Sequence, residues 1–516
     1  MLSLSSTGGV WLTVDDKLKI ASLLDTLGVH YIEAGNPGSN VKDALFFSRA
    51  QKELELKNAK LVAFGATVRK GISPKDDENI QSLLSANTEA VCIFGKCWDL
   101  HAEHILGVDL LENLGLIADT VAYLKGMGKE VIFDAEHFFD GYKHNKEYAL
   151  ACINTAAGSG ADMVCLCDTN GGTFPHEVAD AVTAAAAVCR APISIHAHND
   201  TGMADAVTLC AIMSGAVGFQ ATISGIGERC GNANLFTTLA NLTLKLGYDT
   251  VPKENLKKMR AISVAYAEIA NVRQLSRAPY VGKHAFYHKA GMHVDVILKA
   301  PHAMEHIDPA LVGNHRETAI SDIAGSRAMW ERMRRVAPEI SREDPAVKEV
   351  LNQIKEMELN GYQFEGADAS LELLIRKKLG KFNHHFDLIA FKVLVEEPHS
   401  PDVSLATIEI GVGGEIEITA AQGNGPVNAL DAAARKALER FYPSLRQIRL
   451  TDYKVRVLDT NATASEVRVV IETRDDKHTW STVGVSTDVI NASWIALVDS
   501  LEYKLLKDEL EKGGES

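Results

Sequence analysis

Two histidines separated by one residue are the clearest sign of chemistry in this sequence. His196 and His198 end an apolar run that begins at Pro192 and is typical of a β-strand. Because residues i and i+2 of a strand point to the same side, both imidazoles are expected to face one point beyond the strand's carboxyl end. Two neutral imidazoles placed in this way form half of a divalent-metal site, and the alternative is two solvated histidines in a loop.

A glycine-rich segment follows the next strand candidate and is therefore expected beside the histidine pair. It contains Gly225, Gly227, Glu228 and Asn232. Glycine lets the backbone approach a ligand closely, and the amide oxygen of Asn232 is a suitable ligand for a hard cation. The alternative interpretation is an ordinary glycine turn.

Carboxylate and hydroxyl groups end three further strand candidates, at Glu33, Glu136 and Thr169. Such groups can bind a small oxo acid or relay protons, although acidic and hydroxyl side chains also serve as helix N-caps. His101 lies in a loop, where a packed histidine is the commoner case. His293 lies in a later, helical region, either as a surface residue or on an arm that delivers a base to the site.

The first half of the chain has the strand and helix pattern of a fold that brings these strand ends together. Seven short runs rich in apolar residues alternate with helical patterns, which predicts a parallel sheet with right-handed crossovers. The runs lie near residues 29–34, 60–65, 90–94, 130–134, 162–167, 192–196 and 219–223. No Gly-x-Gly-x-x-Gly follows the first run, and polar residues end almost every run. The pattern therefore favours a (β/α)₈ TIM barrel over an open nucleotide-binding sheet.

A closed barrel of this type needs eight strands, so one is missing from the count. The sequence begins with residues that lack a strand pattern and continues with a helical one. We therefore expect the first strand of the barrel to precede Met1, within roughly 20–30 further residues of one strand and its loop.

The remainder of the chain changes character twice. Residues 249–385 are mainly helical, and from residue 386 three strand candidates and a helix are followed by the same order again. The two helix starts share an Asn-Ala pair, at Asn428 and Asn491, which indicates an internal duplication. The expected domains are a TIM barrel over residues 1–248, a helical region over 249–385 and a duplicated α+β domain over 386–516.

Composition excludes several classes of protein. The formal net charge of −15 comes from acidic residues spread along the chain, which disfavours nucleic acid as a partner. No run of eighteen apolar residues is present, so no membrane span is expected. The eight cysteines lie in apolar runs before residue 231, and the first residues lack a signal or transit pattern. These features predict reduced thiols in a cytoplasmic protein.

Taken in order, the motifs resemble the family of citramalate, isopropylmalate and homocitrate synthases, the DRE-TIM metallolyases. The likeness extends from about Leu12 to the C-terminus and is closest to the citramalate synthases around residues 134–142 and Asn40. The segments that carry it are residues 94–96, 134–142, 167–173, 196–200, 227–234, 361–366 and 423–430.

The resemblance implies a condensation of acetyl-CoA with pyruvate, followed by thioester hydrolysis to (R)-citramalate, a precursor for isoleucine biosynthesis. It implies a divalent metal ion (Mn, Mg or Zn) held by His196 and His198, with Asn232 close by. Glu136 and Thr169 would contact the oxo acid.

Other residues acquire roles only through the resemblance. His101 would lie at the pocket edge, and His293 would take part in removing the acetyl methyl proton, assisted by Glu228. Because His293 would be supplied by the neighbouring subunit, a homodimer is implied. The C-terminal domain would bind a branched-chain amino acid as feedback effector. Its family signature includes Gly423, Asn424, Gly425, Pro426 and Asn428.

Two departures from the family leave three interpretations open. The family begins with Asp-Thr-Thr-Leu-Arg-Asp-Gly, and it commonly has a tyrosine where Met304 stands; this sequence has neither. The first interpretation is a citramalate synthase whose first strand precedes Met1. The second is a 2-isopropylmalate synthase-like acyltransferase acting on a larger oxo acid, and the third is a catalytically impaired paralogue that retains effector binding.

Overall fold

The computed structural model describes residues 2–3, 10–288, 296–297, 299–318, 326–364, 366–395, 404–458 and 465–513. The chain divides into two compact units, each of which is described by itself. The first unit comprises residues 1–286 and 305–316, and the second comprises residues 287–304 and 317–516. No helix of the described residues is long and apolar enough to cross a membrane.

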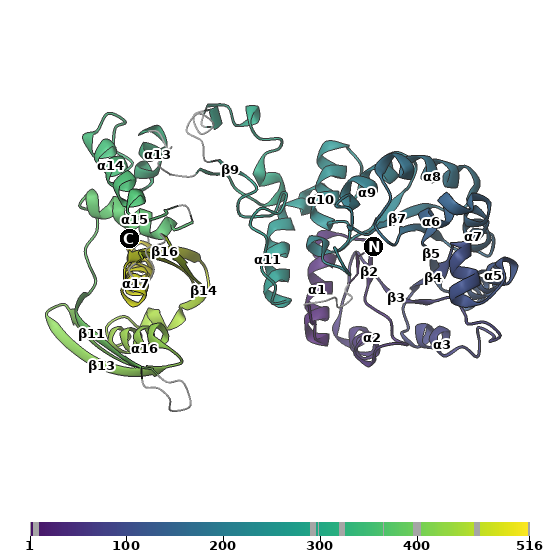
Figure 1. Ribbon diagram of the computed structural model, residues 1–516, viewed down its shortest axis with the longest axis horizontal. Coiled ribbons are helices and arrows are strands. Elements are labelled where there is room, and N and C mark those ends of the chain that lie inside the picture. Colours follow the sequence, from purple (N-terminus) through teal and green to yellow (C-terminus); the bar gives the residue numbers. More distant parts are fainter. Residues whose placement is uncertain are drawn as a thin grey trace. The chain divides into compact units, whose positions relative to one another are not determined.

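The first unit contains one sheet of eight strands, all parallel and in chain order; several of its strands are labelled in Figure 1. The strands are β1 (Leu2–Ser3), β2 (Tyr31–Glu33), β3 (Lys60–Ala66), β4 (Ala90–Lys96), β5 (Glu130–Glu136), β6 (Met163–Asp168), β7 (Ile193–Ala197) and β8 (Gly218–Gln220). The main helices between and after them are α1 (Val14–Leu27), α2 (Val41–Glu53), α3 (Glu78–Ser85), α5 (Leu110–Gly126), α7 (Lys146–Gly158), α8 (Pro175–Val188), α9 (Ala204–Met213) and α10 (Leu235–Ala240). These helices surround the strands, so the predicted α/β TIM-barrel class is confirmed.

The first place in the sheet is occupied by a pairing of only two residues. β1 pairs in parallel with β2, with Leu2 opposite Ile32 and Ser3 opposite Glu33. A pairing of two residues requires only extended backbone at the edge of β2, so no sequence pattern announces it. Among the described residues, no pairing joins β8 to β1.

Residues along the barrel strands alternate between two environments. Val91 and Ile93 of β4 pack in the large core shared with the helices, whereas Cys92 belongs to a cluster inside the barrel with Val62 and Ile132. This alternation follows from the two-residue period of a strand. Because Ile132 on β5 faces inward, the side chains of residues 134 and 136 on the same strand face inward as well.

The second unit carries helices and two antiparallel sheets. The helices α13 (Ser326–Val336), α14 (Pro345–Leu359) and α15 (Asp368–Lys378) precede the sheets. Three strands and a helix then occur twice in the same order. The first set is β11 (Asp387–Val395), β12 (Ser404–Val412), β13 (Glu415–Gly423) and α16 (Pro426–Leu438), and the second is β14 (Arg449–Val457), β15 (Val467–Arg474), β16 (Thr479–Ser486) and α17 (Val489–Gly513). In each set the helix packs on one face of its own sheet, burying Ile408 and Ala433 in the first set and Ile471 and Ala496 in the second.

Candidate functional site

A cavity of about 550 Å³ opens at the carboxyl ends of the barrel strands. The sequence-predicted residues that line it are Glu33, Glu136, Thr169, His196, His198, Glu228 and Asn232. The other lining residues include two phenylalanines, Phe64 and Phe94, whose rings stack with centroids 5.4 Å apart. The cavity thus combines apolar walls with a few converging polar groups, as small-molecule sites usually do.

The histidine pair lies on one wall of this cavity. The rings of His196 and His198 have centroids 5.0 Å apart, and the side-chain amide nitrogen of Asn232 lies 3.1 Å from Nε2 of His196. Burial lowers the pKa of His196, and burial together with the charges of His196 and Arg229 lowers the pKa of His198 to about 3. Nδ1 of His198 is buried and has no hydrogen-bond partner among the described residues.

Backbone pairing places Asn232 beside the histidines. An antiparallel bridge joins His198 to Asn232, and the N–H of Ala233 donates to the carbonyl of Ala197 at 3.1 Å. Gly227 is required here, because a Cβ at this position would lie 1.8 Å from Oδ1 of Asn232. The glycine-rich segment is therefore shaped around the asparagine side chain.

Arg229 connects this segment to two strand ends and was given no role in the sequence analysis. Its guanidinium donates to both carboxylate oxygens of Asp200, at 2.9 and 3.0 Å, and to the carbonyl of Thr169 at 2.7 Å. The bidentate geometry fixes the orientation of both groups. The neighbouring Glu228 lines the mouth of the cavity, with a side chain 78% exposed.

Glu136 and Thr169 are held by groups that the sequence analysis did not single out. Lys96 forms an ion pair with Glu136, with Nζ 2.5 Å from Oε2. The hydroxyl oxygen of Thr169 accepts a hydrogen bond of 2.8 Å from the backbone N–H of His137. Because a hydroxyl also has one proton to donate, the Thr169 O–H can donate to an acceptor in the cavity. Lys96 belonged to a family motif, but its partner depended on the fold.

His101 is not among the residues that line the cavity. Its ring stacks on Trp98 with centroids 5.0 Å apart and meets His137 edge-on at 4.4 Å. Burial, followed by the nearby charges of His137 and Lys96, lowers its pKa. His101 therefore packs in an aromatic cluster near the strand end that carries Glu136.

Two further sets of predicted residues lie elsewhere. His293 is outside the described residues. The segment with Gly423, Asn424, Gly425, Pro426 and Asn428 connects β13 to α16 in the second unit. It forms a tight turn, because Oδ1 of Asn428 accepts the N–H of Asn424 at 3.0 Å and a Cβ on Gly423 would lie 2.4 Å from the next helix's backbone.

A buried hydrogen-bond chain below the histidines was missed by the sequence analysis. The side-chain amide of Gln220 on β8 donates from Nε2 to Oδ1 of Asp134 at 2.7 Å, and its Oε1 lies 2.8 Å from Nδ1 of His196. Burial, and then the charge of Glu33, raises the pKa of Asp134 to about 7. A glutamine within the mainly apolar run at 219–223 was the available signal.

Three family profiles match successive parts of the chain. Residues 5–265 match the profile described as HMGL-like, residues 280–361 match a homocitrate synthase post-HMGL domain-like profile, and residues 365–505 match the LeuA allosteric (dimerisation) domain.

Individual relatives cover nearly the whole chain. The (R)-citramalate synthase of Aquifex aeolicus is 49% identical over 511 residues, covering 98% of this chain and 97% of the relative. The (R)-citramalate synthase of Geobacter sulfurreducens is 47% identical, covering 97% and 95%. Among solved structures, the hydroxymethylglutaryl-CoA lyase of Pseudomonas aeruginosa matches 52% of this chain and 89% of its own, with 16% identity and a TM-score of 0.44.

Proposed function

The chain belongs to the (R)-citramalate synthase family, and from this premise we propose that it condenses acetyl-CoA with pyruvate and hydrolyses the thioester to (R)-citramalate and CoA. This reaction supplies isoleucine biosynthesis. The observation that carries the proposal is the convergence of His196, His198, Asn232, Glu136 and Thr169 on one cavity, in a chain 43–49% identical to five (R)-citramalate synthases.

The donor groups at the cavity wall fit a divalent cation. Two neutral imidazoles and an asparagine amide are a nitrogen and oxygen set suited to Mn²⁺, Mg²⁺ or Zn²⁺. The orphaned Nδ1 of His198 supports this assignment, because a buried polar atom without a partner is costly. His196, His198 and Asn232 would hold the ion. When bound, it supplies Lewis-acid polarisation of the ketone of the oxo acid.

The chain's own residues bind the oxo acid and handle protons. The free O–H of Thr169 donates to the carboxylate of pyruvate, and Glu136, held by Lys96, borders the same space. Glu228 at the mouth and His293 are assigned to removal of the acetyl methyl proton. Glu33 also lines the cavity, and its carboxylate is assigned to binding of the oxo acid.

The first sheet of the second unit supports a homodimer. Leu394, Ile416 and Ile418 are 57–69% exposed and lie on the face of the sheet opposite α16. An apolar face of this kind is typical of an interaction surface. A second copy of the chain is the assigned partner, in keeping with the dimerisation domain that residues 365–505 match. The turn at residues 423–428 is assigned to a branched-chain amino-acid effector.

A substrate comparison tests the proposal. Purified protein with acetyl-CoA is offered pyruvate or 2-oxoisovalerate, and free CoA thiol is measured. We expect faster thiol release with pyruvate; preference for the larger acid would instead favour a 2-isopropylmalate synthase-like enzyme. No release with either acid would support the impaired paralogue.

A further inference from the structure

We propose that Gln220 and Asp134 select the tautomer of His196 that presents the Nε2 lone pair to the cavity. Both are positioning residues that act through His196, and the inference deepens the metal site of the proposed function, on which it rests. The two side chains lie on β8 and β5, at 5–6% exposure.

The direction of the hydrogen bonds follows from the chemistry of the groups. The side-chain amide nitrogen of Gln220 faces Asp134 and donates to Oδ1 at 2.7 Å, a bond in which the carboxylate oxygen is the acceptor. The amide oxygen of Gln220 is then directed at Nδ1 of His196, 2.8 Å away. Because this oxygen can only accept, Nδ1 must carry the proton, and Nε2 is left with its lone pair.

The contact at the other ring nitrogen agrees with this assignment. The side-chain amide nitrogen of Asn232 lies 3.1 Å from Nε2 of His196. An N–H donor can approach Nε2 at this distance only if that nitrogen bears a lone pair. The ring is therefore held from both sides, with its acceptor atom directed at the group of residues assigned to the metal.

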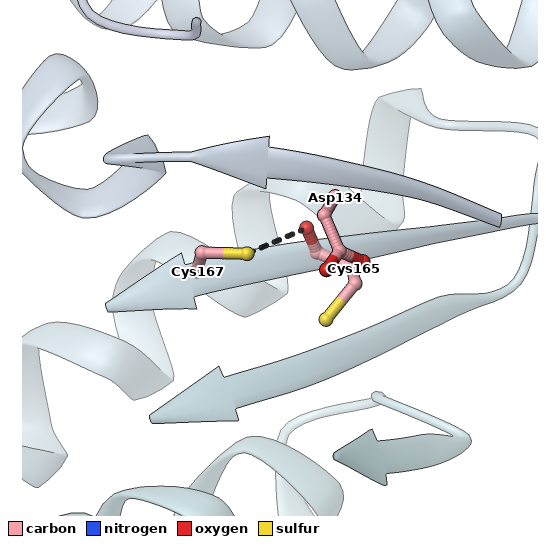
Figure 2. A group of neighbouring side chains, drawn as sticks. All are labelled: Asp134, Cys165 and Cys167. Carbon is pink, nitrogen blue, oxygen red and sulfur yellow. Dashed lines mark hydrogen bonds between the residues drawn. The ribbon is translucent and has the colours of Figure 1, made fainter. Parts of the chain in front are cut away.

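Asp134 is the strongest hydrogen-bond acceptor among the groups that surround it. Asp134, Cys165 and Cys167 form a buried group whose potential ligand atoms all lie within 4.8 Å of one another (Figure 2). The thiol of Cys167 is already directed at the carbonyl oxygen of Cys165, at 3.7 Å. Burial raises the pKa of the Cys165 thiol, and the hydrogen bond to Cys165 together with burial raises that of Cys167. Neutral thiols are weak acceptors, so the Gln220 amide nitrogen is directed to the carboxylate.

The group in Figure 2 contains a carboxylate and two thiols, and thiols are a ligand type that binds soft metal ions. Its hydrogen bonds, however, give it a different role. One carboxylate oxygen of Asp134 is occupied by Gln220, and the cysteines retain their protons. A histidine that binds a metal generally needs a second residue that orients its ring. Loss of such an orienting residue typically weakens metal binding by about 10–100-fold. Asp134 and Gln220 supply this orientation from inside the barrel.

Three variants test the inference: Gln220→Met, Asp134→Asn, and the double variant Gln220→Glu with Asp134→Asn. Gln220→Met removes the acceptor for Nδ1. Asp134→Asn replaces the carboxylate with an amide that can donate as well as accept, so the side-chain amide of Gln220 is no longer held in one orientation. In the double variant the new asparagine donates to the new glutamate, whose carboxylate again accepts from Nδ1 of His196. Gln81→Met is the matched control, since Gln81 also donates through its side-chain amide, to Tyr123 at 3.2 Å, but on α3.

Two measurements on purified full-length protein decide the outcome. Nitrogen-15 signals of labelled histidine in metal-free protein report the tautomer, with His196→Gln used to identify the signal. Electron paramagnetic resonance titration reports Mn²⁺ affinity. We expect a protonated Nδ1 in the wild type, about 10–100-fold weaker Mn²⁺ binding in Gln220→Met, weaker binding in Asp134→Asn, recovery in the double variant and no change in the control.

Each contrary result has one meaning. A wild-type signal with the proton on Nε2, or Gln220→Met protein that binds Mn²⁺ as tightly as the wild type, overturns the inference. A double variant that binds no better than Asp134→Asn also overturns it. Failure of the wild type to bind Mn²⁺ refutes the proposed metal site instead, and the nitrogen-15 signal still decides the tautomer. Melting temperatures of all variants separate these outcomes from misfolding.

Discussion

A buried lysine next to the candidate site allows a quantitative prediction about stability. Lys17 of α1 is 1% exposed, and its ammonium donates to Asp43 at 2.5 Å and to the carbonyl of Ala34 at 2.9 Å. Asp43 in turn accepts the backbone N–H of Asn36 at 3.1 Å. The pair therefore holds the loop that follows β2, directly after the cavity residue Glu33.

Lys17→Met removes one partner and leaves the Asp43 carboxylate buried without its counter-ion. Breaking a buried pair in this way costs about 3–5 kcal/mol. For units of this size each kcal/mol shifts the melting temperature by about 2–4 °C, so the barrel transition should fall by about 6–20 °C. Lys17→Met combined with Asp43→Asn removes both charges, keeps an acceptor for the N–H of Asn36 and should recover much of the loss.

Differential scanning calorimetry is the suitable assay, because the two units can melt separately and only the barrel transition should move. A single variant that melts within about 1 °C of the wild type would contradict the argument, since that shift corresponds to less than 1 kcal/mol. So would a double variant that melts at or below the single one. The same variants should raise the KM for pyruvate if the loop after β2 positions Glu33.

Three other perturbations have defined outcomes. Gly227→Ala should abolish most CoA release without lowering the melting temperature greatly, because its Cβ would displace the Asn232 side chain. Ile418→Asp should convert dimers to monomers in sedimentation velocity, since it places a charge on the exposed apolar face of the first sheet. Burial lowers the pKa of His385, but its bond to the buried Glu502 outweighs this, so the folded-state pKa is raised. The pair's stabilisation is therefore complete below the unfolded-state pKa of about 6.5 and is lost as pH rises through the folded-state value. His385→Asn should flatten this decline in the second unit's melting temperature.

Matched variants control these experiments. Gly158→Ala lies at the end of α7, where an added Cβ meets no atom within 4 Å, so activity should be unchanged. Leu111→Asp changes an 80% exposed residue of the barrel unit and should leave the dimer intact. If Gly227→Ala is as active as Gly158→Ala, the close approach of Gly227 to the asparagine has no role in the reaction. Equal dissociation by both aspartate variants would show that the effect is not specific to the sheet face.

Much of the candidate site could be predicted from residue spacing. The i, i+2 rule applied to His196 and His198 is local, and carboxyl ends of parallel strands meet at one edge regardless of the loops between them. Glu136 and Thr169 followed from the same rule, and all four line one cavity. The position of His101 could not be obtained in this way, because it lies in the short helix α4 (Asp99–His101) and not on a strand.

Long-range partners and very short elements could not be predicted. β1 contains two residues, too few for a sequence pattern to identify. The partners of Arg229 lie 29 and 60 residues away, on the ends of two different strands. Spacing along the chain gives the strand on which a residue lies, but not which side chains of other strands meet it.

The bond between Gln220 and Asp134 shows how fold and site depend on each other. β5 and β8 are three strands apart in the sheet, which in a flat sheet would separate them by about 14 Å. Their side chains nevertheless meet at 2.7 Å, across 86 residues of sequence. Only a strongly curved sheet brings inward-facing residues of these strands together. The curvature that gathers the strand ends around the cavity therefore also creates the contact that orients His196. A substitution that flattens the sheet should disturb the histidine before it unfolds the barrel.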